Sequence, residues 1–328
     1  MATLDHYSQG YFTGDGNAHL LNIRSDVDAV LVRNLTKTIT PVGGTGVQFY
    51  WQRGMAQNSA IQTTSLGVST QITTNGIALI NTADPQVPGP QLSGTSISTA
   101  TPPLVASGNT GTLQNGDIVE VYNAVGALQF QGYQFTVGNV VSNTQFELSY
   151  APTIAVGSTV NYRVIKFQPM YYPRRLFISS VSQATQAVVV LTVTHNLTVG
   201  QRIVFGVIPA MYGMTQLSGL RATIVAINTT TNSITIDIDT TGFTAFAFPL
   251  TAVAATAHTE PSIVPFGDGL NPLSNPLGNQ SVLDGATRNL AILGIYLGAG
   301  ANGPAGIASD QIFWQIWKAE QLQTTYFA

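Results

Sequence analysis

Hydrophobic and polar positions alternate in short segments along most of the chain, which predicts β-strands nearly everywhere. Five segments are rich in β-branched or aromatic residues and end at turn residues: 27–35, 47–53, 118–122, 224–228 and 234–238. Segments of about five to nine residues separated by such turns are typical of β-sandwiches and small β-barrels. No window keeps an i, i+3, i+4, i+7 apolar stripe over three turns, so we expect little helix.

The middle of the chain contains two related segments. Gly116 aligns with Gly200 and Gly132 with Gly219, so the offset grows from 84 to 87 residues, which a short insertion around 209–212 explains. Each copy contains a strand, a loop, a strand led by glycine, an Asn/Thr turn and a further strand. Because glycine permits a bulge or a sharp bend, this pattern predicts a small antiparallel barrel. Chance similarity between two β-rich segments is the alternative explanation.

Proline-rich segments at 84–90, 168–173 and 260–280 predict the domain boundaries. The two strands expected near the C-terminus, 290–297 and 311–318, would form only a marginal hairpin alone, so we expect them to pair with the N-terminal strands. The prediction is an all-β protein in which an antiparallel, jelly-roll-like β-sandwich is interrupted by two tandem small β-barrels. The predicted domains are a discontinuous sandwich at 1–91 plus 259–328, a first barrel at 92–167 and a second barrel at 174–258. Three sequential domains are the alternative.

Charged residues are scarce, at 8% of the 328 residues with a net charge of −3, against roughly 25% in an ordinary soluble domain. Such a chain has little electrostatic repulsion between copies, which favours a subunit that packs against copies of itself. A secreted all-β protein with a hydroxyl-rich surface is the alternative. The basic residues form no cluster, so we expect no nucleic-acid partner.

No membrane association or secretion is expected. The most apolar stretch, 243–257, is shorter than the ~20 residues that a membrane-spanning helix needs. Residues 1–10 contain no apolar core of the kind found in a signal peptide.

Candidate residues for catalysis or metal binding are not evident. The chain has no cysteine, which excludes disulfides, thiolate metal sites and cysteine nucleophiles. Its histidines show no metal-binding spacing, and no Gly-x-Ser-x-Gly motif occurs. We therefore predict no catalytic residue, no cofactor and no metal site, and the protein is not expected to be an enzyme. A triad assembled from distant residues is the possibility that a sequence cannot exclude.

Two short motifs resemble ligand sites only superficially. Residues 298–303 match G-x-G-x-x-G, but Pro304 and Gly306 follow where a dinucleotide fold needs a helix, so a flexible hairpin loop is expected. Asp237 and Asp239 begin like a calcium loop without the remaining ligands, which favours a strand end with an Asx turn. Asp26 and Asp28 share the same spacing and interpretation. Weak binding of a hard cation is the alternative for both acidic pairs.

Aromatic side chains suggest two further sites. Tyr50-Trp51 and Phe313-Trp314, with Trp317, lie on expected strands, where core packing is the first interpretation and a sugar-stacking platform the second. A separate cluster lies in the linker between the repeats and consists of Tyr171, Tyr172, Arg174 and Arg175. Tyrosine and arginine are enriched at protein interfaces, so this cluster is predicted to contact either a neighbouring subunit or another domain of the same chain.

The repeats resemble a known module. The motif at 196–203, Asn-Leu-Thr-Val-Gly-Gln-Arg-Ile, followed by a strand led by glycine, is similar to that of the FCCH-like small barrel, and the match covers about 92–257. That barrel takes its name from ubiquitin-activating enzymes and is common in large structural proteins of tailed phages. Ubiquitin chemistry is not implied, because the chain has neither a cysteine nor an adenylating domain.

The resemblance implies a non-enzymatic virion structural protein of a tailed bacteriophage. It would be a capsid-surface or capsid-decoration, neck or tail component that self-associates as a homo-oligomer and contacts other virion proteins. The alternative function is a fibre or spike component that binds a host surface glycan.

Overall fold

The computed structural model describes residues 6–21, 23, 27–80, 88–155, 159–165, 176–251, 260–266 and 294–318. Its strands form a curled sheet of eight strands, a sheet of seven strands and a closed barrel of six strands. Helix in the described residues is limited to one short α-helix and three 3₁₀ turns. The expectation of an all-β protein is confirmed.

The chain divides into two compact units. Unit 1 comprises residues 1–81, 197–202 and 292–328, and unit 2 comprises residues 82–196 and 203–291. The predicted domains at 1–91 plus 259–328, 92–167 and 174–258 stay a prediction, and each unit is described by itself below.

Unit 1 contains the eight-stranded sheet and the α-helix. Its strands pair in the order β1-β21-β3-β4-β5-β6-β20-β2, every pair being antiparallel. The elements are β1 (His6–Thr13), β2 (His19–Leu21), β3 (Ala29–Asn34), α1 (Leu35–Ile39), β4 (Gly46–Gln52), β5 (Ser59–Thr64), β6 (Ser69–Ile80), β20 (Gly294–Leu297) and β21 (Gln311–Lys318).

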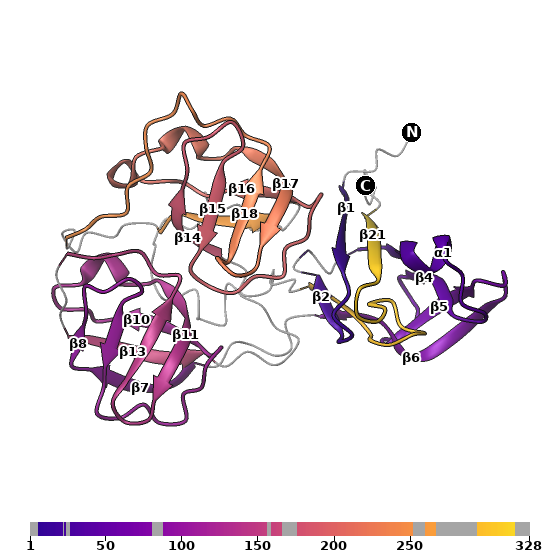
Figure 1. Cartoon of the computed structure of the whole chain (residues 1–328), viewed down its shortest axis with the longest axis horizontal. Helices are drawn as coiled ribbons and strands as arrows, with labels where there is room; N and C mark the ends of the chain where they lie inside the picture. Colours follow the sequence, from indigo (N-terminus) through magenta and orange to yellow (C-terminus); the bar gives the residue numbers. More distant parts are fainter. Residues whose placement is uncertain are drawn as a thin grey trace, which may run out of the picture. The chain divides into compact units, whose positions relative to one another are not determined.

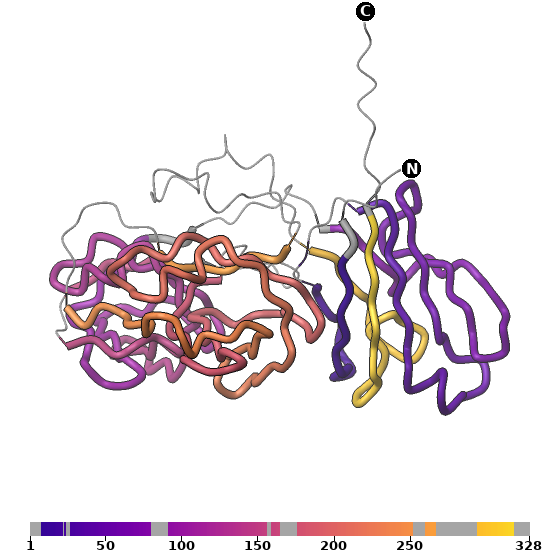
Figure 2. Tube along the Cα trace, turned by 90° about the horizontal axis from the view of Figure 1, so that it is seen from above, coloured from indigo at the N-terminus to yellow at the C-terminus, as the bar shows by residue number. Residues whose placement is uncertain are grey.

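The two ends of the chain share this sheet. Strand β21, yellow in Figures 1 and 2, runs between β1 and β3, and β20 lies between β6 and β2. Trp314 is the partner of Gly10 on one side and of Val32 on the other. The expected pairing of the C-terminal strands with the N-terminal ones is thereby confirmed.

The expected sandwich requires a correction, because the described strands of unit 1 form one curled sheet rather than two stacked sheets. The physical reason lies in β6, whose pairing with β5 jumps from Ala60 opposite Ile72 to Ser59 opposite Ile77. At this corner Gly76 N–H donates to Asn58 O at 2.9 Å, and a Cβ on Gly76 would clash with the backbone of Ser59. One strand therefore serves both walls of the curl.

The core of unit 1 fills the inside of the curl. Alternate side chains of β3, β4 and β21 point inward, so that Val32, Phe49, Trp51 and Trp314 are buried together with Ile77. Burying both tryptophans removes a large apolar area from water, which is the main stabilising contribution available to a single sheet.

Unit 2 contains the seven-stranded sheet and the closed barrel. The sheet, purple to magenta in Figure 1, has the order β7-β13-β10-β11-β12-β9-β8, and the barrel, rose to orange, has the order β14-β15-β18-β17-β16-β19. The sheet contains β7 (Pro88–Gly94), β8 (Ser96–Ile97), β9 (Leu104–Ala106), β10 (Ile118–Tyr122), η1 (Leu128–Phe130), β11 (Gln134–Val141), β12 (Gln145–Ser149) and β13 (Val160–Ile165). The barrel contains β14 (Leu176–Val181), β15 (Val188–Leu191), β16 (Arg202–Phe205), η2 (Ala210–Tyr212), η3 (Thr215–Leu217), β17 (Arg221–Asn228), β18 (Ser233–Ile236) and β19 (Ser262–Pro265).

The two repeats share their glycine conformations. Gly116 and Gly200, two residues before β10 and β16, have φ of 89° and 81°. Gly132 and Gly219 have φ of 84° and 75° and follow 3₁₀ turns. Each of this second pair donates its N–H to the preceding strand, Gly132 to Val121 O at 2.8 Å and Gly219 to Phe205 O at 3.1 Å. The aligned glycines therefore occupy equivalent backbone positions, which glycine adopts without strain.

Candidate functional site

The interface residues predicted in the linker, Tyr171, Tyr172, Arg174 and Arg175, lie outside the described residues. Asp26 lies outside them as well. The prediction for the linker cluster therefore stays a prediction.

The glycine-rich motif at 298–303 lies in the hairpin between β20 and β21, as expected. Its backbone is closed by hydrogen bonds from Gly303 N–H to Gly300 O and from Gly300 N–H to Gly306 O, both 3.0 Å. A further hydrogen bond of 2.9 Å joins Ala305 N–H to Gly298 O. These bonds leave the motif as part of a folded loop and not as the start of a helix.

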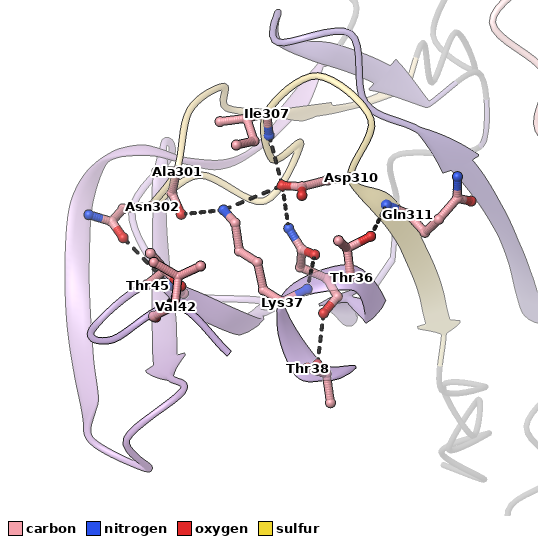
Figure 3. A network of polar contacts seen from close by, with 12 residues as sticks. Thr36, Lys37, Thr38, Val42, Thr45, Ala301, Asn302, Ile307, Asp310 and Gln311 are labelled. Carbon is pink, nitrogen blue, oxygen red and sulfur yellow. Dashed lines mark hydrogen bonds and ion pairs between the residues drawn. The ribbon is translucent and has the colours of Figure 1, made fainter. Parts of the chain in front are cut away.

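A buried ion pair holds this loop against α1 (Figure 3). Lys37 Nζ donates to Ala301 O at 2.8 Å and lies 3.4 Å from Asp310 Oδ2. Asp310 Oδ2 also accepts from Asn34 Nδ2 at 2.7 Å and from Ile307 N–H at 2.9 Å. Burial opposes ionisation of Asp310, but these hydrogen bonds and the Lys37 charge outweigh it and lower the pKa of the carboxyl group.

The Lys37 cluster is satisfied internally, which points to a structural role. Asn34 caps α1, because its side chain accepts from Lys37 N–H at 2.9 Å. At the other end of the cluster, Gln311 N–H donates to Thr36 Oγ1 at 2.8 Å. Removing one partner of a buried ion pair costs about 3–5 kcal/mol, so the cluster fastens the N-terminal helix to the C-terminal hairpin. Sequence reasoning missed it, because residues 37 and 310 share no local motif.

The described members of the acidic pairs form local contacts. Asp239 is exposed, and its Oδ1 accepts from both Thr241 N–H at 2.9 Å and Thr241 Oγ1 at 2.6 Å. These bonds, which lower the pKa of Asp239, form the expected Asx turn. Asp28 forms an ion pair with Arg53, Oδ1 to Nε at 2.8 Å.

The segment that carries the barrel motif belongs partly to unit 1. Thr198 Oγ1 accepts the indole N–H of Trp314 at 3.0 Å, and Tyr11 N–H donates to Val199 O at 2.9 Å. The hydroxyl of Thr198 therefore satisfies the polar atom of a buried tryptophan, which would otherwise destabilise the core.

A second buried cluster joins the two repeats of unit 2. Tyr133 Oη donates to Tyr212 Oη at 3.1 Å, and the Tyr133 ring lies 5.3 Å from the Phe177 ring and 5.5 Å from the Phe248 ring. Burial is the main cause of the raised pKa of both tyrosines, so both hydroxyl groups stay protonated. The cluster is an apolar contact with one internal hydrogen bond.

The surface with functional potential is the outer face of the unit 1 sheet, opposite its core. Side chains that point away from the core form three rows across β1, β21, β3, β4, β5 and β6, fixed by the strand registers. The first row is Tyr11, Phe313, Arg33, Gln48, Thr63 and Ser69; the central row is Gln9, Gln315, Leu31, Tyr50, Ile61 and Gln71; and the third row is Trp317, Ala29 and Gln52. We call these residues the outer face.

The outer face combines rings, amides and hydroxyls. Tyr11 is 46% exposed and Ile61 is 39% exposed, while Tyr50, Phe313 and Trp317 are half-buried. Among the described side chains of this face, Arg33 alone carries a charge. The core interpretation of the aromatics is thus correct for Trp51 and Trp314, and their strand neighbours lie on the opposite side of the sheet.

No group of three or more acidic or histidine side chains that could hold a metal ion occurs in the part of the chain that the structure describes. Within that same part, no helix has the length and apolarity needed to cross a membrane.

No protein-family model matches the chain, and no curated protein matches it significantly.

Proposed function

We propose that this protein is a non-enzymatic structural subunit of a tailed-phage virion, a capsid-surface, neck or tail component that contacts copies of itself and other virion proteins. The observation that carries the proposal is the outer face, which presents one exposed ring, three half-buried rings and several amides with one charge, in a chain that has 8% charged residues. Interfaces between proteins are depleted in charge and enriched in aromatic residues at their centre.

The organisation of unit 2 supports the phage part of the proposal. In the seven-stranded sheet, β7 and β8 are separated only by Thr95 and pair with β13 and β9. In the closed barrel, the single strand β14 takes the place of both β7 and β8, because it pairs with β19 on one side and with β15 on the other. The other strands follow the same order in the two, β13-β10-β11-β12-β9 in the sheet and β19-β16-β17-β18-β15 in the barrel. We therefore infer that unit 2 contains two copies of one small barrel, the arrangement expected of tandem FCCH-like modules.

The proposal is tested on particles. Antibodies raised against the full chain should label purified virions of the phage that encodes it, and quantitative mass spectrometry should give a fixed number of copies per particle. Protein that occurs in infected cells and is absent from purified particles would contradict the proposal.

A glycan-binding fibre or spike is the second candidate. The observation that favours it is the alternation of Tyr50, Phe313 and Trp317 with glutamines on one face, since sugars stack on rings and bond to amides. A glycan array probed with the full chain tests this candidate, and Tyr50→Ala should abolish any binding observed.

A further inference from the structure

We propose that the outer face is an isologous contact between two copies of this chain, with the two-fold axis running along the central row. The proposal rests on the proposed function and names one partner, a second copy. Isologous contacts use the same patch on both subunits, so the patch must be complementary to itself. The three rows meet this requirement in polarity and charge.

Rotation about the central row places each central side chain against its own copy and the first row against the third. Gln9, Gln315 and Gln71 then lie opposite their equivalents. Within one copy Gln315 Nε2 donates to Gln9 Oε1 at 3.3 Å, and an amide is compatible with an identical amide across the axis because it both donates and accepts. Phe313 of one copy meets Trp317 of the other, because these residues flank Gln315 on β21. The contact thus pairs amides with amides and rings with rings.

Charge favours this axis over others. Arg33 lies two residues along β3 from Leu31, and at about 3.4 Å per residue the two Arg33 Cα atoms are displaced by about 14 Å along the strand direction across the axis. That separation exceeds the Debye length of about 8 Å at physiological ionic strength, so their repulsion is largely screened. A face with several charges would oppose itself in an isologous contact.

The size of the outer face is sufficient for a dimer. Six strands about 4.8 Å apart and three rows about 7 Å apart, the third row on three of the strands, span at most roughly 25 by 15 Å between Cα atoms along the curl of the sheet. With a margin of one side chain, this footprint reaches about the 800 Å² per partner that standard interfaces bury.

A rival surface exists on the same unit. Ile39, Val42, Leu66 and Val68 are exposed, and Ser65 joins two of their loops by donating from Oγ to Val42 O at 2.8 Å and from N–H to Thr45 O at 2.9 Å. We call Ile39, Val42, Leu66 and Val68 the apolar tip. It offers aliphatic side chains without amides or rings, and it serves as the comparison surface in the tests.

Sedimentation velocity of the full chain over a hundredfold concentration range provides the first test. The wild type should show a monomer–dimer equilibrium. Ile61→Lys should raise the dissociation constant of the dimer at least tenfold, because it places two ammonium groups opposite each other on the axis. Leu66→Lys on the apolar tip and Val141→Lys, an exposed position in unit 2, should leave the constant unchanged. The circular dichroism of all variants should match the wild type, since the three side chains are exposed.

Cross-linking through introduced cysteines gives the second test. The chain has no cysteine, so the wild type cannot react and serves as the negative control. Tyr50→Cys on the central row should give a covalent dimer with a short bis-maleimide reagent. Leu66→Cys and Val141→Cys should stay monomeric under the same conditions. Sheets that stack face to face lie about 10 Å apart, within the span of such a reagent.

Three results would overturn the inference: a wild type that stays monomeric throughout, an association that Ile61→Lys leaves unchanged, or one that Leu66→Lys abolishes. Glycan binding by a monomer that Tyr50→Ala abolishes would also overturn it in favour of the second candidate. None of these results would remove the protein from purified virions, so failure of this inference is distinguishable from failure of the proposed function.

Discussion

The two repeats of unit 2 keep the same backbone turns but use the next residue differently. Gly132 and Gly219 share their φ and their hydrogen bond to the preceding strand. The residue after Gly132 is Tyr133, fully buried, whereas the residue after Gly219 is Leu220, which is 39% exposed. The backbone conformation is thus the same at the two glycines, while the side chains that follow them are packed differently.

The contact between the repeats comes from the place where they differ in length. The segment that makes the second repeat longer folds as η2, and it supplies Tyr212, whose hydroxyl oxygen accepts a hydrogen bond from the hydroxyl of Tyr133. Phe248, which follows the last strand before β19, packs against both tyrosine rings. The departure from the repeat therefore creates the surface that joins the two copies.

The largest expected effect is at the residue after the glycine. Tyr133→Ala removes a fully buried ring and should lower the free energy of unfolding by about 3–5 kcal/mol. Leu220→Ala at the equivalent exposed position should cost less than about 1 kcal/mol. Urea denaturation of the full chain gives both values, and equal losses would show that the two positions are not differently packed.

The next largest effect should be a difference between the two repeats in how their stability depends on pH. His195 of the second repeat has its pKa lowered to about 4 by burial, whereas the 84-residue offset places Gly111 there in the first. Its ordinary pKa is about 6.5, so as the pH falls from 6.5 to 4 the unfolded chain takes up a proton that the folded repeat does not. This linkage removes up to about 3 kcal/mol over that interval.

Hydrogen exchange measured by mass spectrometry at pH 6.5 and pH 4.5 resolves the two repeats by peptide. After correction for intrinsic rates, the second should lose protection at the lower pH, and His195→Gln should reduce that loss. His19 of unit 1, whose pKa burial also lowers to about 4, should act the same way there. A first repeat as sensitive as the second would contradict the assignment to His195.

The glycines themselves provide a smaller contrast. Ala at either position must adopt a left-handed φ, which costs roughly 1–2 kcal/mol. A Cβ on Gly132 would also press against the buried carboxylate of Glu260, whereas nothing lies within 4 Å of a Cβ on Gly219. Gly132→Ala should therefore destabilise more than Gly219→Ala in the same denaturation experiment, and the reverse order would refute the packing difference.

The smallest expected effect concerns the hydroxyl pair. Tyr212→Phe keeps the ring but leaves the buried hydroxyl of Tyr133 without its acceptor, at a cost of about 1–2 kcal/mol. The double variant Tyr133→Phe, Tyr212→Phe should recover part of that loss, because it leaves no orphaned hydroxyl. A double variant that loses more free energy of unfolding than the two single variants together would contradict this account.

Local patterns were sufficient to predict individual strands. The predicted segments 118–122 and 311–318 coincide with β10 and β21, because β-branched and aromatic runs there end at turn residues. Helix α1 was missed, since its five residues depend on the Asn34 cap and on the buried contact of Lys37 with Asp310. Such a contact joins residues that no sequence window contains together.

The outer face could be predicted only in part. Alternation showed that Tyr50 and Trp51 point to opposite sides of a strand, but not that Tyr50, Leu31 and Gln315 form one row. That row depends on strand order and register, and on the insertion of β21 between β1 and β3. Strand order is set by packing of the whole unit, which local propensity does not encode.

The position of β21 also determines when unit 1 can fold during synthesis. Strands β1 and β3 become neighbours only through β21, which ends at Lys318. Roughly 240 residues separate β6 from that point, and at about 5–20 residues per second the ribosome needs about 10–50 s to translate them. The N-terminal strands thus wait with an unpaired edge while unit 2 emerges. A chaperone that binds extended apolar strands would be able to bind the chain in this interval. A chain released before β21 is made would keep the unpaired edge and tend to aggregate.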